Sequence, residues 1–374
     1  MYEYCHGGNV RFEPNGADFL DLSANINPLG FPEGVEEAVK NEIHFCCCYP
    51  DNKSFRLREC IADFEQVKPE WIFCGNGSSD IIFRLPFCLK PRKALIEQPT
   101  FSDYERSLKS YGTKIHYHKL EENWNFECDE NIATIAKREL VDLIFLCNPN
   151  NPTGILTKRK IIENLLRSCR NWKAVLVVDE CFIDFTEQAN DVTMKPLLSE
   201  FDNLIILKAF TKIFALPGIR LGYAICNNKE LIDKLYFHGT DWAVSNLAQA
   251  AGTAALKNAE TYLKETVLFV KQERQYVKGE LENLKYKVFD SQANFLFIKS
   301  PYDFDLQEEL DKHRIRIRSY KNIDGLGAGF YRLALSQHQY NIRLIETVQK
   351  IVSEQNKISN KNFDNVQENI CTDL

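Results

Sequence analysis

Short apolar runs followed by longer amphipathic segments are the feature that most constrains this chain. The runs are KALIEQ (93–98), DLIFLCNP (142–149), KAVLVVDE (173–180) and NLIILKAF (203–210). Runs this short and apolar fit strands that are buried on both faces, and a helix between them is what a parallel crossover requires. The pattern therefore predicts an α/β fold with a parallel sheet covered by helices.

Helical periodicity fills the space between and after these strands. The expected helices are Ser54–Phe64, Ser78–Cys88, Thr100–Tyr111, Lys158–Arg170, Lys229–Phe237, Asn246–Leu256 and Glu260–Leu284. After about residue 285 the pattern changes to short strands, KVFD, NFLFIKS, IRIRS and FYRLALS, around the helices Phe304–His313 and Tyr340–Glu354. That arrangement is typical of a small α+β domain.

The length of 374 residues favours two domains. Residues 1–45 are expected to form an N-terminal arm and part of the small domain. Residues 46–265 form the large domain, and residues 266–355 complete the small one. The segment 356–374 has almost no apolar periodicity and is expected to be disordered.

Composition narrows the classes of partner. The net charge of −6 gives no electrostatic reason to bind nucleic acid or an anionic membrane. No stretch is apolar for long enough to span a bilayer, and the N-terminus lacks the pattern of a secretory signal. The 13 cysteines are scattered without a C-x-x-C pair, so we expect a cytoplasmic protein with no metal site.

The segment AFTKIFALPGIRLGY (209–223) is the strongest indication of chemistry. Lys212 follows a buried strand and lies between apolar residues, with the Thr211 hydroxyl beside it and Arg220 eight residues later. An amine that is partly removed from water has a lowered pKa and can form a Schiff base with an aldehyde cofactor. A guanidinium nearby could bind the phosphate of that cofactor.

Three further segments place polar groups after expected strands. CGNGSSD (74–80) offers backbone amides and two serine hydroxyls to an anion, although a plain turn fits it equally well. LCNPNNPTG (146–154) presents Asn151 on an irregular loop. VVDECFIDF (177–185) places Asp179 at the end of a buried strand, where it either pairs with a cation such as a protonated pyridine or caps a helix.

In this order, GNGSSD, NPNNPTG, VVDECF and FTKIFALPGIRLGY resemble the fold-type-I pyridoxal-phosphate aminotransferases of class I/II. The resemblance covers about residues 18–350. It implies a large domain with a mostly parallel seven-stranded sheet and a small α+β domain from both chain ends. It also implies a homodimer with active sites at the subunit interface.

The resemblance also implies roles for individual residues. Lys212 should bind pyridoxal 5'-phosphate covalently, Asp179 should pair with its ring nitrogen, and Asn151 should reach its O3′ atom. The other expected cofactor contacts are Gly77, Ser78, Ser79, Thr211, Arg220 and the partner subunit's Tyr49 around the phosphate, and Phe101 and Phe182 at the ring.

HGGN (6–9), DLSANINPLGFP (21–32) and WAVSNLAQAAG (242–252) resemble the branch that decarboxylates L-threonine O-3-phosphate in cobalamin biosynthesis. The product there is (R)-1-aminopropan-2-ol O-phosphate. Histidinol-phosphate aminotransferases or broad-specificity class I/II aminotransferases are the alternative. The family resemblance implies that Arg332 binds the substrate carboxylate. In the first branch the phosphate contacts would be His6, Asn9, Asn27 and Arg318. A structural ion pair is the alternative role for Arg318, and a disordered start is the alternative for HGGN.

Two positions depart from the family pattern. Ala209 stands where a serine is common, which removes one hydrogen bond to the phosphate. Phe182 stands where aminotransferases carry a tyrosine, which favours the decarboxylase branch. Some of those decarboxylases carry a cysteine-rich extension, but here the tail has only Cys371, so no metal domain is expected.

Overall fold

The computed structural model describes residues 7, 8, 10 and 18–372, with side chains up to residue 357. Its large domain contains a seven-stranded sheet in the order β2-β8-β7-β6-β5-β3-β4. β8 is antiparallel to β2 and β7, and every other pair is parallel. The predicted α/β class with a mostly parallel sheet is therefore confirmed.

The strands of this sheet are short and largely buried. They are β2 (Ile72–Gly75), β3 (Lys93–Gln98), β4 (Lys114–Lys119), β5 (Leu143–Cys147), β6 (Val175–Asp179), β7 (Leu204–Ala209) and β8 (Gly222–Ile225). β3, β5, β6 and β7 are the four apolar runs of the sequence. The apolar pattern does not reveal β4, KIHYHK, because this strand lies at the edge of the sheet, where polar side chains remain in contact with water.

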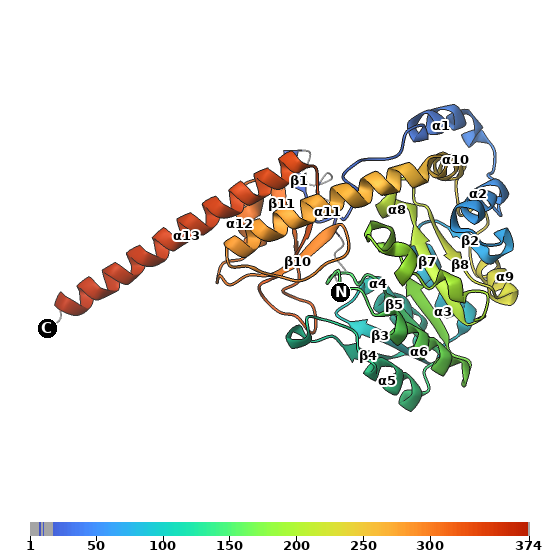
Figure 1. The fold of residues 1–374 in the computed structure, drawn as a ribbon, viewed down its shortest axis with the longest axis horizontal. Helices are drawn as coiled ribbons and strands as arrows, with labels where there is room; N and C mark the ends of the chain where they lie inside the picture. Colours follow the sequence, from blue (N-terminus) through green and yellow to red (C-terminus); the bar gives the residue numbers. More distant parts are fainter. Residues whose placement is uncertain (1–6, 9, 11–17, 373–374) are drawn as a thin grey trace.

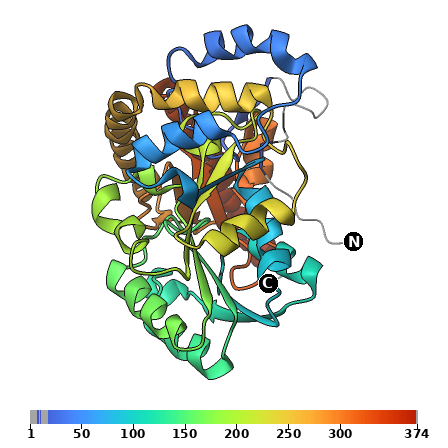
Figure 2. The ribbon, with the colours of Figure 1, turned by 90° about the vertical axis from the view of Figure 1, so that its right-hand side faces the viewer.

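Helices cover both faces of the sheet (Figures 1 and 2). One face packs on α3 (Ser78–Leu89), α4 (Ser102–Tyr111) and α9 (Lys229–Phe237). The other packs on α2 (Phe55–Glu65), α5 (Asn131–Glu139), α6 (Arg159–Arg170) and α10 (Asn246–Leu256). Shorter helices are α1 (Val35–Glu42), which contacts α10, α7 (Ala189–Val192) and α8 (Phe210–Ile213).

The small domain draws on both ends of the chain. Its antiparallel sheet has the order β12-β13-β10-β9, and β1 pairs in parallel with β11 beside it. The segment IRIRS is divided between these two sheets instead of forming one strand. The elements are β1 (Leu20–Asp21), β9 (Lys287–Val288), β10 (Phe295–Lys299), β11 (Ile315–Arg316), β12 (Arg318–Ser319), β13 (Phe330–Ala334) and α12 (Leu306–Lys312).

Two long helices complete the fold. In Figure 1, α11 (Ala259–Asn283) extends from the large domain to the small one, and α13 (His338–Thr372) projects beyond the body of the molecule. The polar segment after residue 356, which the sequence predicts to be disordered, continues as part of α13, because it contains no glycine or proline to end the helix. Within the described residues, no helix has both the length and the apolar character needed to cross a bilayer.

Candidate active site

A cavity of about 330 Å³ lies where the carboxyl ends of β3, β5, β6 and β7 meet the small domain. This edge of an open α/β sheet is where ligands bind in such folds. The cavity brings together eleven of the residues predicted from the sequence: Ser78, Ser79, Phe101, Asn151, Asp179, Phe182, Thr211, Lys212, Arg220, Arg318 and Arg332.

Lys212 lies on α8, one short turn after the fully buried strand β7. Its backbone oxygen accepts a hydrogen bond from the amide of Asn27, which fixes the turn. Desolvation, together with the positive charges of Arg332 and Arg220, lowers the pKa of Lys212 to about 8. A larger share of this amine is therefore neutral near pH 7 than in an ordinary lysine, and the neutral amine is the nucleophile.

Asp179 ends β6 and is 5% exposed. Tyr104 Oη donates to its Oδ2 at 2.6 Å, and the Cys181 amide donates to its Oδ1 at 3.0 Å. Burial raises the pKa of Asp179, while hydrogen bonds from the Cys181 thiol, Tyr104 and the Cys181 amide oppose that rise. The helix-cap alternative is not realised, since the following helical turn begins only at Ile183. The carboxylate is instead placed to balance a cation in the cavity.

The turn before α3 packs against Arg220, and the two together could bind an anion. Gly77 has φ = +81°, and a Cβ atom there would lie 2.7 Å from Arg220 Nη2, so glycine lets the guanidinium pack against the turn. Ser78 is the first residue of α3, whose N-terminal amides favour a phosphate. Thr211 lines the same part of the cavity. Ser79 also lines it while its hydroxyl donates to Asp103 Oδ2 at 3.1 Å.

Asn151 connects the large-domain side of the cavity with the small-domain side. Its Oδ1 accepts a hydrogen bond from Arg332 Nη1 at 2.6 Å, which leaves its Nδ2 as the donor for an oxygen atom of a bound molecule. Phe101 and Phe182 form aromatic walls, and Phe182 packs edge-on against Phe295 with the ring centroids 5.2 Å apart. Phe182 therefore offers an apolar surface where a tyrosine would offer a hydroxyl.

Two arginines form the wall on the small-domain side. Arg318 on β12 and Arg332 on β13 are directly paired in the sheet register and both line the cavity. Arg332 is 7% exposed, and its Nη2 donates to the Ser23 carbonyl oxygen at 2.6 Å. The Arg318 guanidinium lies over the Tyr320 ring. Both guanidinium groups therefore present positive charge to the cavity, where an anionic ligand could contact them.

Some predicted residues do not line the cavity. Asn27 is buried outside the cavity lining, and its amide donates to the Ile213 carbonyl and to Thr266 Oγ1, both at 2.8 Å. Its side chain is committed to supporting the turn that carries Lys212. Gly77 lies behind the cavity wall, under Arg220.

Tyr49 is also outside the cavity, with 80% of its surface exposed and its ring stacked on Trp242 at 4.4 Å. The remaining two predicted substrate contacts, His6 and Asn9, lie outside the described residues.

Sequence reasoning missed several residues of the wall. Asn25 lies two positions before Asn27 in the same loop, is 2% exposed and lines the cavity, and its Oδ1 has no hydrogen-bond partner among the described residues. Tyr104 and the thiols Cys147 and Cys181 also line it. The signal for Asn25 was present in SANINP, but the spacing did not indicate which asparagine faces inward.

The donor set fits pyridoxal phosphate: an amine of lowered pKa, a buried carboxylate, and an anion site at a helix start. The chain matches the family described as "Aminotransferase class I and II" over residues 17–339. The threonine-phosphate decarboxylase of Salmonella typhimurium is 32% identical over 362 residues, covering 94% of this chain and 98% of that protein. The histidinol-phosphate aminotransferase of Caldanaerobacter subterraneus subsp. tengcongensis is 32% identical over 338 residues, covering 89% and 93%.

Among solved structures, the histidinol-phosphate aminotransferase from Clostridium acetobutylicum superposes with a TM-score of 0.83 at 31% identity. The match covers 90% of this chain and 99% of that one. Decarboxylases and aminotransferases are thus both similar to this chain over nearly its whole length. The chain belongs to the class I and II aminotransferase family, whose cofactor is pyridoxal phosphate.

Proposed function

We propose that this enzyme decarboxylates L-threonine O-3-phosphate to (R)-1-aminopropan-2-ol O-phosphate, a step of cobalamin biosynthesis. The observation that carries the proposal is the pair Arg318 and Arg332 in one wall of the lysine-bearing cavity. A substrate with a phosphate and a carboxylate needs two cationic contacts, and a chain of net charge −6 must supply them locally. The similarity to the Salmonella decarboxylase supports the same substrate.

When bound, the cofactor supplies an electron sink for the carbanion that forms as the carboxylate leaves. Asp179 would hold a proton on the ring nitrogen, and Asn151 Nδ2 would donate to the ring oxygen. The α3 amides, Ser78 and Arg220 would bind the cofactor phosphate. Asp179 and Asn151 are already held by hydrogen bonds, so these two groups need little rearrangement during the reaction.

On the substrate side, Arg332 would bind the carboxylate and Arg318 the phosphate. Arg332 is already hydrogen-bonded to Asn151 and Ser23, so its guanidinium has a fixed plane. Lys212 Nζ would return a proton to the substrate carbon after CO₂ leaves. Phe182 has no hydroxyl, so it would not donate a hydrogen bond to the ring oxygen of the cofactor as a tyrosine would.

The second candidate is histidinol-phosphate aminotransferase, favoured by the similarity to the Clostridium acetobutylicum structure. Both reactions begin with the same groups and differ in which bond at the substrate carbon breaks. The deciding assay incubates the holoenzyme with L-threonine phosphate and measures CO₂ and aminopropanol phosphate. A parallel assay supplies histidinol phosphate with 2-oxoglutarate. Transamination of histidinol phosphate without CO₂ release from threonine phosphate would overturn the proposal.

A homodimer is part of the proposal. Tyr49 is exposed outside its own cavity, but its loop is well fixed, because Asn246 donates to the Phe45 and Cys48 carbonyls and Gln249 donates to the Asp51 carbonyl. Large apolar side chains are exposed along the same part of the chain: Phe31, Ile43, Phe45 and Phe55. A second copy covering them would bring its cavity to Tyr49. Sedimentation of the holoenzyme tests this, and a monomer would contradict it.

A further inference from the structure

Tyr104 is held both by aromatic packing and by a hydrogen bond to Asp179. It lies in the first turn of α4, is fully buried, and stacks on Phe145 with the ring centroids 5.0 Å apart and the planes at 7°. Phe101 packs on its edge at 5.6 Å. These contacts hold the phenol so that its hydroxyl donates to Asp179 Oδ2 at 2.6 Å.

Asp179 needs this donor because it is buried in a largely apolar place. A carboxylate without hydrogen bonds in such a place takes up a proton and loses its charge. Here one oxygen accepts from the Cys181 amide and the other from Tyr104. The Cys181 thiol is a further donor to Asp179, and it stays protonated at pH 7 because burial raises its pKa.

We propose that Tyr104 is a positioning residue of the active site. Its hydroxyl holds the Asp179 carboxylate ionised and in place, so that this carboxylate keeps a proton on the ring nitrogen of the cofactor. The inference rests on the proposed function, which puts that nitrogen beside Asp179. It also explains why a tyrosine occupies a site where phenylalanine would pack equally well.

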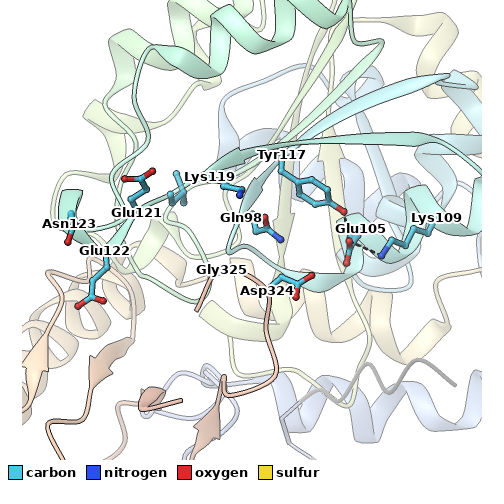
Figure 3. A pocket seen from close by; sticks show the side chains of 11 residues that line it. Gln98, Glu105, Lys109, Tyr117, Lys119, Glu121, Glu122, Asn123, Asp324 and Gly325 are labelled. Carbon is cyan, nitrogen blue, oxygen red and sulfur yellow. Dashed lines mark hydrogen bonds and ion pairs between the residues drawn. The ribbon is translucent and has the colours of Figure 1, made fainter. Parts of the chain in front are cut away.

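The chain offers a matched control outside the catalytic cavity. Tyr117 on β4 donates to the carboxylate of Glu105 on α4, which also pairs with Lys109. Figure 3 shows these three residues together on one side of a second pocket, with Gln98 and Asp324 next to them. Tyr117→Phe removes the same kind of hydrogen bond away from the catalytic cavity.

The test compares Tyr104→Phe with Tyr117→Phe, both reconstituted with cofactor labelled with ¹⁵N in its ring. We expect the ¹⁵N chemical shift of Tyr104→Phe to move from the protonated toward the unprotonated range. We also expect its kcat to fall roughly 10- to 100-fold, the range expected for a hydrogen bond to a charged group, with KM nearly unchanged. Tyr117→Phe should match the wild type in both measurements. A Tyr104→Phe shift equal to that of the wild type would overturn the proposal, even if its kcat fell.

A readout without cofactor separates this inference from the proposed function. Infrared titration of the apoprotein, with Asp179→Asn subtracted, should give a higher midpoint for the Asp179 carboxyl in Tyr104→Phe than in the wild type. Equal midpoints would show that the hydroxyl does not act on Asp179. Wild-type protein that takes up no cofactor would defeat the proposed function, while the infrared comparison would still decide the role of Tyr104.

Discussion

The two halves of the cavity are built in different ways. The cofactor half consists of side chains at the ends of β5, β6 and β7 and at the start of α3, and each stands next to buried backbone of the central sheet. The substrate half combines β12 and β13 of the small domain with the loop around Ser23 and Asn25 from the other end of the chain. Its main charges, Arg318 and Arg332, are brought together only by strand pairing.

We expect the cofactor half to determine the chemistry and the substrate half to determine which substrate is accepted. Groups fixed on the central sheet keep the geometry of the cofactor constant, which every reaction of the family needs. Short strands and loops can change the spacing of cationic groups without disturbing that geometry. Changes in the cofactor half should therefore reduce every activity, whereas changes in the substrate half should affect particular substrates.

Lys212→Ala should have the largest effect. The variant loses both the nucleophile and the group that returns a proton, so the rate should fall beyond the roughly 10²- to 10⁴-fold contributed by proton transfer alone. Borohydride reduction and peptide mapping should label Lys212 in the wild type and nothing in the variant. Label on another lysine would refute the assignment.

The same contrast explains what the sequence could predict. Asp179 ends a buried strand, and Lys212 and Asn151 follow one closely, so strand prediction also places these residues at one edge of the sheet. Tyr104 is different, because in an amphipathic helix it has the pattern of any core aromatic residue. Its hydrogen bond to Asp179 depends on how α4 packs on β5 and β6, and no local spacing encodes that packing.

Arg318→Ala should give the next largest effect and should sharpen the contrast within the substrate half. Losing a charge-assisted contact to the phosphate should cost about 2–4 kcal/mol of affinity for threonine phosphate. Activity toward a non-phosphorylated amino acid should hardly change. Arg332→Ala is the matched variant and should impair both substrates. Equal losses for both substrates in Arg318→Ala would mean that Arg318 has a structural role.

Asn27 and Asn25 provide a smaller test, one of stability. Asn27→Ala leaves the Ile213 carbonyl and the Thr266 hydroxyl without their buried donor, so the free energy of unfolding should fall by about 1–3 kcal/mol. Asn25→Ala should change stability less and should weaken substrate binding more. Urea unfolding and substrate titration of both variants measure the difference. The reverse result would restore Asn27 as the substrate contact.

The different positions of these two asparagines, Asn25 in the cavity lining and Asn27 outside it, have a physical reason. The backbone between them turns sharply, because the Ile26 amide bonds to the Ala24 carbonyl and Asn27 Oδ1 accepts from the Leu29 amide. Such a turn has neither the 2-residue nor the 3.6-residue period that indicates direction from sequence. Which asparagine faces the cavity is decided by the packing of the loop against α8 and α11.

The smallest expected effect is on the pH dependence of cofactor capture. It tests whether the charge of Arg332 in the substrate half lowers the pKa of Lys212 in the cofactor half. Desolvation and the charges of Arg332 and Arg220 lower the pKa of Lys212 to about 8. Only the neutral amine reacts, so capture by the apoprotein should rise about tenfold per unit below pH 8 and level off above it. A free lysine derivative measured in parallel corrects for ionisation of the cofactor itself. Arg332→Ala removes a positive charge from the substrate half, so it should move the midpoint upward. A wild-type midpoint near 10.5, or one that Arg332→Ala leaves in place, would show that the lysine does not sense the arginine.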